Sequence, residues 1–146
     1  MPRWLQVVLA IIAVGIVTVI ILAFVGYRWM SRNGGRLQAQ MKQLTAQGSE
    51  YGRGKDVTDC MDESVRLYRA SGKSFKGRFT TQIWMESCVR SATVTPAFCA
   101  TAPRGSEIFK SAQWAVAECA KRGLANDRGC SNFMLVAPRA CDMKRE

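Results

Sequence analysis

Six cysteines are the residues in this sequence whose type and spacing could support chemistry, in a chain of 146 residues that has no histidine. Without histidine, a Ser-His-Asp or Cys-His nucleophile pair and a histidine ligand for a metal or haem are excluded. No two cysteines lie closer than 11 positions, so the spacings of redox CxxC, c-type haem and zinc-ribbon motifs are absent. An even number at regular spacing instead predicts disulfides formed in an oxidising compartment. The six residues are Cys60, Cys88, Cys99, Cys119, Cys130 and Cys141.

A weak internal repeat suggests how these cysteines pair. Two Cys-x10-Cys units superpose with a shift of 31 residues, and each reads as a helix, a short turn and a second helix with one cysteine in each arm. Cysteines equidistant from a turn can reach disulfide distance. The positions of the cysteines about the two turns favour the pairs Cys88–Cys99, Cys119–Cys130 and, by elimination, Cys60–Cys141. The pairing that we keep open beside it is Cys60–Cys88, Cys99–Cys119 and Cys130–Cys141, and buried free thiols remain the alternative for a cytoplasmic domain.

The segment 66–79 combines basic and aromatic side chains in a Gly/Ser-containing stretch. It has five cations, interleaved aromatic residues, and no acid between Glu63 and Glu86. Such a surface can hold phosphates, an acidic polymer or anionic lipid headgroups. The simpler interpretation is a solvated loop whose aromatic residues reach into the core. The candidate anion-binding residues are Arg66, Arg69, Lys73, Lys76 and Arg78.

Carboxylates give no comparable signal for catalysis. Asp59, Asp62 and Glu63 lie in the first turns of an expected helix, where acids are explained by the helix dipole. No phosphate-binding loop, nucleophile elbow or EF-hand pattern occurs. We therefore expect a protein that is not an enzyme and that has no catalytic residues, no metal and no cofactor.

The strongest pattern in the chain is the uncharged run 5–26, in which only Gln6 and Thr18 are polar. At about 1.5 Å per residue, its 22 residues extend about 33 Å as a helix, enough to cross a hydrocarbon core of about 30 Å. Trp4, Tyr27 and Trp29 flank the run as membrane-interface residues. Residues 1–30 are therefore predicted to be an uncleaved transmembrane signal anchor, with a cleaved signal peptide as the alternative.

The two orientation signals disagree. Arginines at 28, 32 and 36 follow the apolar run and slightly favour a cytoplasmic C-terminal part. The six cysteines favour the opposite side. We give the cysteines more weight because the charge difference is small, and we expect a single-pass membrane protein whose C-terminal domain is extracytoplasmic, and periplasmic if the protein is bacterial.

Residues 31–56 are expected to form a juxtamembrane tether that is partly helical, with a short amphipathic helix on the membrane surface or against a partner as the alternative. The triplet Asn33-Gly34-Gly35 predicts a break, and Leu37, Met41 and Leu44 then recur along one helical face. Residues 57–146 follow as a separate disulfide-rich helical domain.

Helix signals divide this domain into about five short helices arranged as hairpins. Their predicted ranges are 57–71, 80–92, 96–102, 106–122 and about 127–137, with caps at Asp56, at Thr95 and at Asn126 or Asp127, and a stop at Pro138. For the fourth helix, Ile108, Ala112, Ala115, Val116 and Cys119 form the expected core face. No strand pattern is convincing, so the fold class is all-α: an N-terminal transmembrane helix and a small disulfide-stapled domain.

The charge and anchor together define the function that we expect. The formal net charge is +10, and the expected partners are the lipid bilayer and other membrane or envelope protein subunits. The favoured function is a non-catalytic accessory, assembly or structural subunit of a larger membrane-associated complex, with Trp84, Phe98, Phe109 and Trp114 as candidate contact residues. The alternative is a module that binds an anionic envelope polymer or lipid headgroups through segment 66–79. Nucleic acid is disfavoured by the extracytoplasmic location.

Overall fold

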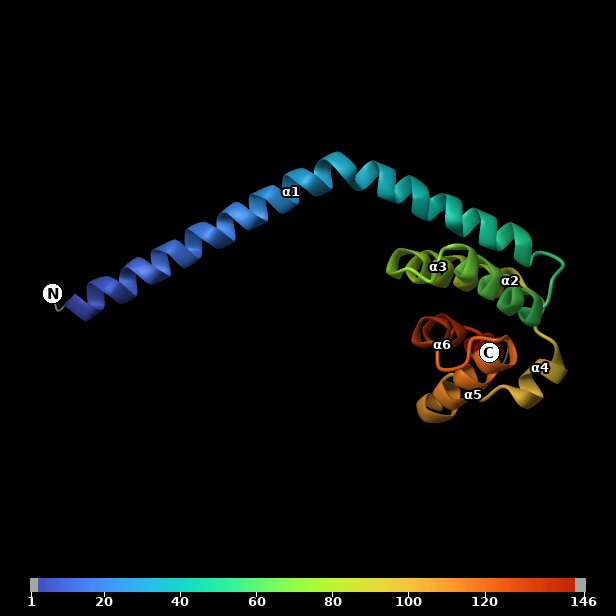
Figure 1. Ribbon diagram of the computed structural model, residues 1–146. Helices are drawn as coiled ribbons and strands as arrows, with labels where there is room; N and C mark the ends of the chain where they lie inside the picture. The colour runs from blue at the N-terminus through green and yellow to red at the C-terminus, as the bar shows by residue number, and fades with distance from the viewer. Residues whose placement is uncertain (1–2, 144–146) are drawn as a thin grey trace. The chain divides into compact units, whose positions relative to one another are not determined.

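The computed structural model describes residues 3–143, and Figure 1 shows their helices. The predicted all-α class is confirmed: within the described range there is no strand, only an isolated bridge between Asp56 and Thr93. Residues 1–2 and 144–146, at the outer ends of the predicted segments 1–30 and 57–146, lie outside that range. The chain divides into two units, the first ending at Gln40 and the second beginning at Met41.

The first unit is the N-terminal part of α1 (Arg3–Gly52). Its stretch Gln6–Trp29 is long and apolar enough to cross a membrane, by length and composition. The apolar side chains described there are exposed in the chain by itself. The side chains of Trp4, Tyr27 and Trp29, the predicted interface residues, are also exposed near the two ends of this stretch.

The predicted break at Asn33-Gly34-Gly35 is wrong, because α1 continues through it to Gly52. A glycine inside a helix costs about 1 kcal/mol relative to alanine, which weakens a helix but does not by itself end it. The residues that follow, Arg36 to Gln40, are good helix formers. The predicted loose tether 31–56 is therefore helical up to Gly52.

In the second unit, the end of α1 packs closely against α3 (Phe75–Ser91). A Cβ atom at Gly48 would collide with the carbonyl oxygen of Trp84, and one at Gly52 would collide with that of Cys88. The ring of Tyr51 lies 5.3 Å from that of Trp84, centroid to centroid. The two glycines thus let the backbone of α1 approach that of α3.

Helix α2 (Val57–Ala70) begins where the sequence predicts it. Asp56 caps it by accepting a hydrogen bond from the amide of Asp59 at 2.9 Å, and the Asp59 carboxylate accepts one from the Asp56 amide at 3.2 Å. Helix α3 begins five residues earlier than predicted. Its cap is Ser74, whose hydroxyl accepts from the Gly77 amide at 3.0 Å, so Gly77 lies inside the helix rather than in a loop.

Four further helices complete the described part of the domain: α4 (Pro96–Thr101), α5 (Ile108–Lys121), α6 (Arg128–Met134) and α7 (Arg139–Met143). Thr95 caps α4 as predicted, and of the predicted pair Asn126-Asp127 it is Asp127 that caps α6. The predicted last helix to residue 137 is wrong, because α6 ends at Met134 and α7 follows Pro138. Proline here precedes a helix, the position in which its missing amide is harmless.

The core lies between two helix pairs. Helices α2 and α3 form one pair and α5 and α6 the other, and α6 contacts both members of the first pair (Figure 1). Phe133, Met85 and Met134 are completely buried, and the rings of Tyr68 and Phe133 meet edge to face at 5.4 Å.

The predicted core face of α5 is mostly wrong. Ala115 and Cys119 are buried, but Ile108, Ala112 and Val116 are exposed, and Ser111 is buried instead. The Trp114 indole packs against the Phe98 ring at 6.0 Å and turns this side of α5 inward. Burying an indole removes more apolar area from water than burying Ile108 or Val116 would.

Candidate functional site

Three disulfides join the six cysteines, and none of the described cysteines is free. The bond Cys119–Cys130 agrees with the favoured pairing. The favoured bonds Cys88–Cys99 and Cys60–Cys141 are wrong; the bonds present are Cys60–Cys88 and Cys99–Cys141, with Cα atoms 5.9 and 5.6 Å apart. The first of these belongs to the alternative pairing, and the second to neither.

The helix order explains this pairing. Helices α2 and α3 are neighbours joined by a tight turn with positive φ at Gly72 and Lys73, so Cys60 and Cys88 face each other across the pair. The arms that the repeat predicted, α3 and α4, are not such a pair. Cys141 lies on α7, which the sequence analysis did not predict. All six cysteines thus have a structural role.

The predicted anion-binding residues do not act as one free cluster. The guanidinium of Arg66 binds both carboxylate oxygens of Glu63, at 2.7 and 2.5 Å. Arg69 donates to the carbonyl oxygen of Arg122, and the ammonium of Lys73 lies 3.6 Å from Asp127. Three of the five cations therefore already have protein partners.

The other two cations lie at the start of α3, beside exposed aromatic rings. The guanidinium of Arg78 lies 4.9 Å from the centre of the Phe75 ring. Phe75 is 77% exposed, Phe79 is about half exposed, and Lys76 is exposed between them in sequence. The alternative that the aromatic residues of this segment reach into the core holds only for Tyr68, which is buried. We call Phe75, Lys76, Arg78 and Phe79 the α3 tip.

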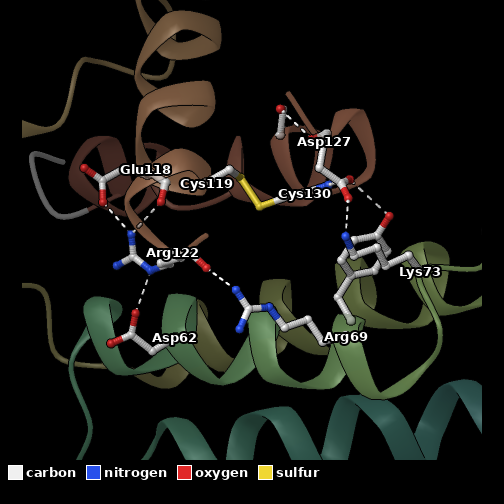
Figure 2. Close-up of a disulfide and its surroundings, with 10 residues drawn as sticks. Asp62, Arg69, Lys73, Glu118, Cys119, Arg122, Asp127 and Cys130 are labelled. Atoms are coloured by element: carbon white, nitrogen blue, oxygen red, sulfur yellow. Dashed lines mark hydrogen bonds and ion pairs between the residues drawn. A yellow bond between two sulfur atoms is a disulfide. The ribbon is translucent and has the colours of Figure 1, made fainter. Parts of the chain in front are cut away.

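An ion-pair network that the sequence analysis missed surrounds Arg122, the residue that ends α5 (Figure 2). Its Nε donates to Oδ1 of Asp62 on α2 at 2.6 Å, and its Nη1 donates to Oε2 of Glu118 at 2.5 Å. The side chains of Arg122 and Glu118 are only 14% and 13% exposed. The spacing of these two residues on α5 is a detectable signal, but the contact with Asp62 spans 60 positions and has none.

The charges of this network are balanced. Partial burial raises the pKa of Glu118, but hydrogen bonds from Lys121 and Arg122 outweigh it and hold that pKa below its ordinary value. Glu118 is thus ionised at neutral pH.

Asp127 forms a second centre of polar contacts, on the other side of the Cys119–Cys130 bond (Figure 2). Its carboxylate accepts hydrogen bonds from the Cys130 amide at 3.0 Å and from the Tyr68 hydroxyl at 3.2 Å. Partial burial raises the pKa of Asp127, but these bonds and the Lys73 ammonium outweigh it and lower the pKa. Asp127 therefore connects the start of α6 to α2 and to the turn before α3.

A cleft of about 280 Å³ opens between α2, α4 and α5. The Trp114 and Phe98 rings meet edge to face in its wall. Its two charged residues, Glu118 and Arg122, bind each other, so the cleft presents hydroxyls and rings rather than free charge. The lining residues are Thr58, Met61, Thr95, Ala97, Phe98, Thr101, Trp114, Glu118 and Arg122.

The outward side of α5 carries apolar side chains without a partner in the domain. Phe109 is 86% exposed, and Ile108 and Val116 are also exposed, with Ala112 between them in sequence. We call these four residues the α5 apolar face. Of the four candidate contact residues, only Phe109 is exposed; Trp84 and Phe98 are buried and Trp114 is half-buried.

Among the described residues no group of three or more Cys, Asp, Glu or His side chains has an arrangement that could hold a metal ion. No protein-family model matches the chain, and no curated protein or solved structure is significantly similar to it.

Proposed function

We propose that this chain is a non-catalytic accessory subunit of a larger membrane-associated complex, and that the α5 apolar face is its contact with another subunit. The observation that carries the proposal is the exposure of Phe109, Ile108 and Val116 on one helix of a domain that already has a buried core. Exposed contiguous apolar groups on a soluble domain mark interaction sites.

The charge around this face favours an apolar protein surface as the partner. Glu107 and Lys110, beside Ile108 and Phe109, bind each other at 2.5 Å, so neither is an unpaired charge at this end of α5. Ala112 is small and would let a second backbone approach closely. An uncharged helix face of this kind fits the apolar groove or helix of another subunit.

The three disulfides support an extracytoplasmic location of the domain. Three disulfides in a domain of about 100 residues are typical of an oxidising compartment. The stretch Gln6–Trp29 would anchor the disulfide-bonded domain to the membrane. That domain would be periplasmic if the protein is bacterial.

The alternative, a module that binds an anionic polymer through the whole segment 66–79, has less support. Arg66, Arg69 and Lys73 would each have to give up a contact with Glu63, the Arg122 carbonyl or Asp127. Of the five cations of this segment, Lys76 and Arg78 in the α3 tip take part in none of the ion pairs of the described residues and donate to no carboxylate or carbonyl oxygen there.

The test is purification of the full chain at native abundance in mild detergent, followed by mass determination and cross-linking mass spectrometry. We expect a complex with a second protein, cross-linked near Lys110, that is lost in the variant Phe109→Asp. Met143→Asp is the matched control, since it places the same charge at another exposed apolar residue, outside both the α5 apolar face and the α3 tip. A monodisperse monomer, or a dimer of this chain alone, would overturn the proposal.

A further inference from the structure

We infer that the α3 tip is a second contact surface, and that its occupant is an anionic lipid bilayer. Phe75 and Phe79 are four residues apart on a helix, so their side chains lie on the same face. Both rings are exposed, and neither belongs to the buried hydrophobic core of the domain.

The charge of the α3 tip separates it from the α5 apolar face. Lys76 and Arg78 flank the two rings, and none of the ion pairs in the described residues involves either cation. The sequence has no acid between Glu63 and Glu86, and the first turn of α3 has none. The start of a helix also has a partial positive charge.

Rings and cations in this arrangement fit a lipid surface better than a protein groove. A phenylalanine ring can enter the boundary between headgroups and acyl chains while neighbouring cations bind the lipid phosphates. The Arg78 guanidinium, stacked on the Phe75 ring at 4.9 Å, can stay over that ring while it binds a phosphate.

The chain also links the second unit, to which this surface belongs, to the candidate membrane span. Only 12 positions of sequence separate Trp29, at the end of the apolar stretch, from Met41, at the start of the second unit. Where that stretch spans a bilayer, a covalent link of this length raises the effective concentration of the whole second unit at that bilayer, so weak contacts are enough.

The experiment uses the full chain in vesicles of phosphatidylcholine alone or mixed with phosphatidylglycerol. Phe75 is replaced by the photo-cross-linking residue p-benzoylphenylalanine, and Phe109, which is at least as exposed, receives the same residue as the matched control. After irradiation, mass spectrometry identifies the cross-linked molecule. Disulfide mapping of each variant verifies the native fold.

We expect lipid adducts at position 75 that increase with phosphatidylglycerol, decrease at high salt, and exceed those at position 109. Adding Lys76→Glu and Arg78→Glu should lower them by roughly ten-fold or more, given the contribution of each cation near an anionic surface. Equal adducts at both positions, or no dependence on phosphatidylglycerol, would overturn the inference. Protein adducts at position 75 would overturn it in favour of a second protein contact. The accessory-subunit proposal stands apart, because it depends on Phe109.

Discussion

Arg122 Nε lies 2.6 Å from Asp62 Oδ1, and this contact joins the end of α5 to α2 across 60 positions of sequence. The guanidinium of Arg122 also binds Glu118, and the main-chain carbonyl of Arg122 accepts a hydrogen bond from Arg69. One residue thus connects the two helix pairs that enclose the core.

Replacing Arg122 should therefore destabilise the domain more than replacing its exposed partner. Arg122→Met leaves the partly buried Glu118 with only Lys121, and we expect the free energy of unfolding to decrease by about 2 kcal/mol. Asp62→Asn, at an exposed carboxylate, should change it by about 0.5 kcal/mol or less. Chemical denaturation followed by near-ultraviolet circular dichroism measures both. Equal effects of the two substitutions would contradict this role of Arg122.

Two buried serines should respond to alanine in opposite directions. The hydroxyl of Ser64 on α2 is buried and has no hydrogen-bond partner, whereas that of Ser111 donates to the Arg104 carbonyl at 3.0 Å. Since an unpaired buried hydroxyl is costly, Ser64→Ala should increase the free energy of unfolding by up to about 1 kcal/mol. Ser111→Ala should decrease it by about 1 kcal/mol. A loss of stability in Ser64→Ala would show that this hydroxyl has a partner.

The four glycines within the second half of α1 should divide into two classes. Gly48→Ala and Gly52→Ala place a methyl group against the α3 backbone, and each should destabilise the second unit by about 1–3 kcal/mol. Gly34→Ala and Gly35→Ala meet no atom within 4 Å and serve as controls that leave that unit unchanged. Thermal unfolding of the full chain compares them. A neutral Gly48→Ala would contradict the close packing of α1 on α3.

Local sequence signals predicted the start of a helix well where a capping residue stands directly before a segment with a clear helical pattern. Asp56 and Thr95-Pro96 each begin a helix at the predicted residue, and α6 begins at Asp127, one of the two predicted caps Asn126 and Asp127. The start of α3 was misplaced because Ser74 precedes a stretch with Gly77 in it, which locally resembles a loop. The predicted break at Gly34 failed for the opposite reason, since a helix tolerates glycine when its neighbours are good helix formers.

Contacts between distant segments could not be predicted in the same way. The bond Cys99–Cys141 depends on α7, a helix of five residues that is too short to have a periodic pattern of its own. Which side of α5 faces the core depends on the packing of Trp114 against Phe98, a residue of another helix. Local sequence therefore does not predict that Ser111 is buried and Ile108 exposed. The same misassignment hid the α5 apolar face, on which the proposed function depends.

Acid should weaken the domain through Asp127. Its pKa in the folded chain is below the ordinary 3.8, so its stabilising effect is complete above that value and is lost as the pH falls through the folded pKa. Asp127→Asn keeps a capping oxygen but removes the charge. We expect this variant to be less stable than the parent at neutral pH and the difference to shrink below about pH 4. Denaturation curves from pH 2 to 7 measure the difference, and one that stays constant with pH would contradict the assignment.

The two C-terminal disulfides should differ in which helices unfold when each is removed. In the chain-entropy description, Cys99–Cys141, with a separation of 42 residues, stabilises by about 4 kcal/mol, and Cys119–Cys130, with a separation of 11, by about 3 kcal/mol. Only the first holds two helices, α4 and α7, that are too short to persist alone.

Replacing Cys99 and Cys141 by serine should therefore remove hydrogen-exchange protection from α4 and α7 while α2 and α3 keep theirs. Replacing Cys119 and Cys130 by serine is the matched control, because it lowers stability without releasing α7. Exchange measured by mass spectrometry, after peptide mapping without reductant has verified the remaining bonds, separates the two cases. If the parent chain instead contains Cys88–Cys99, α7 has no covalent link to α4, and its protection would not depend on Cys99.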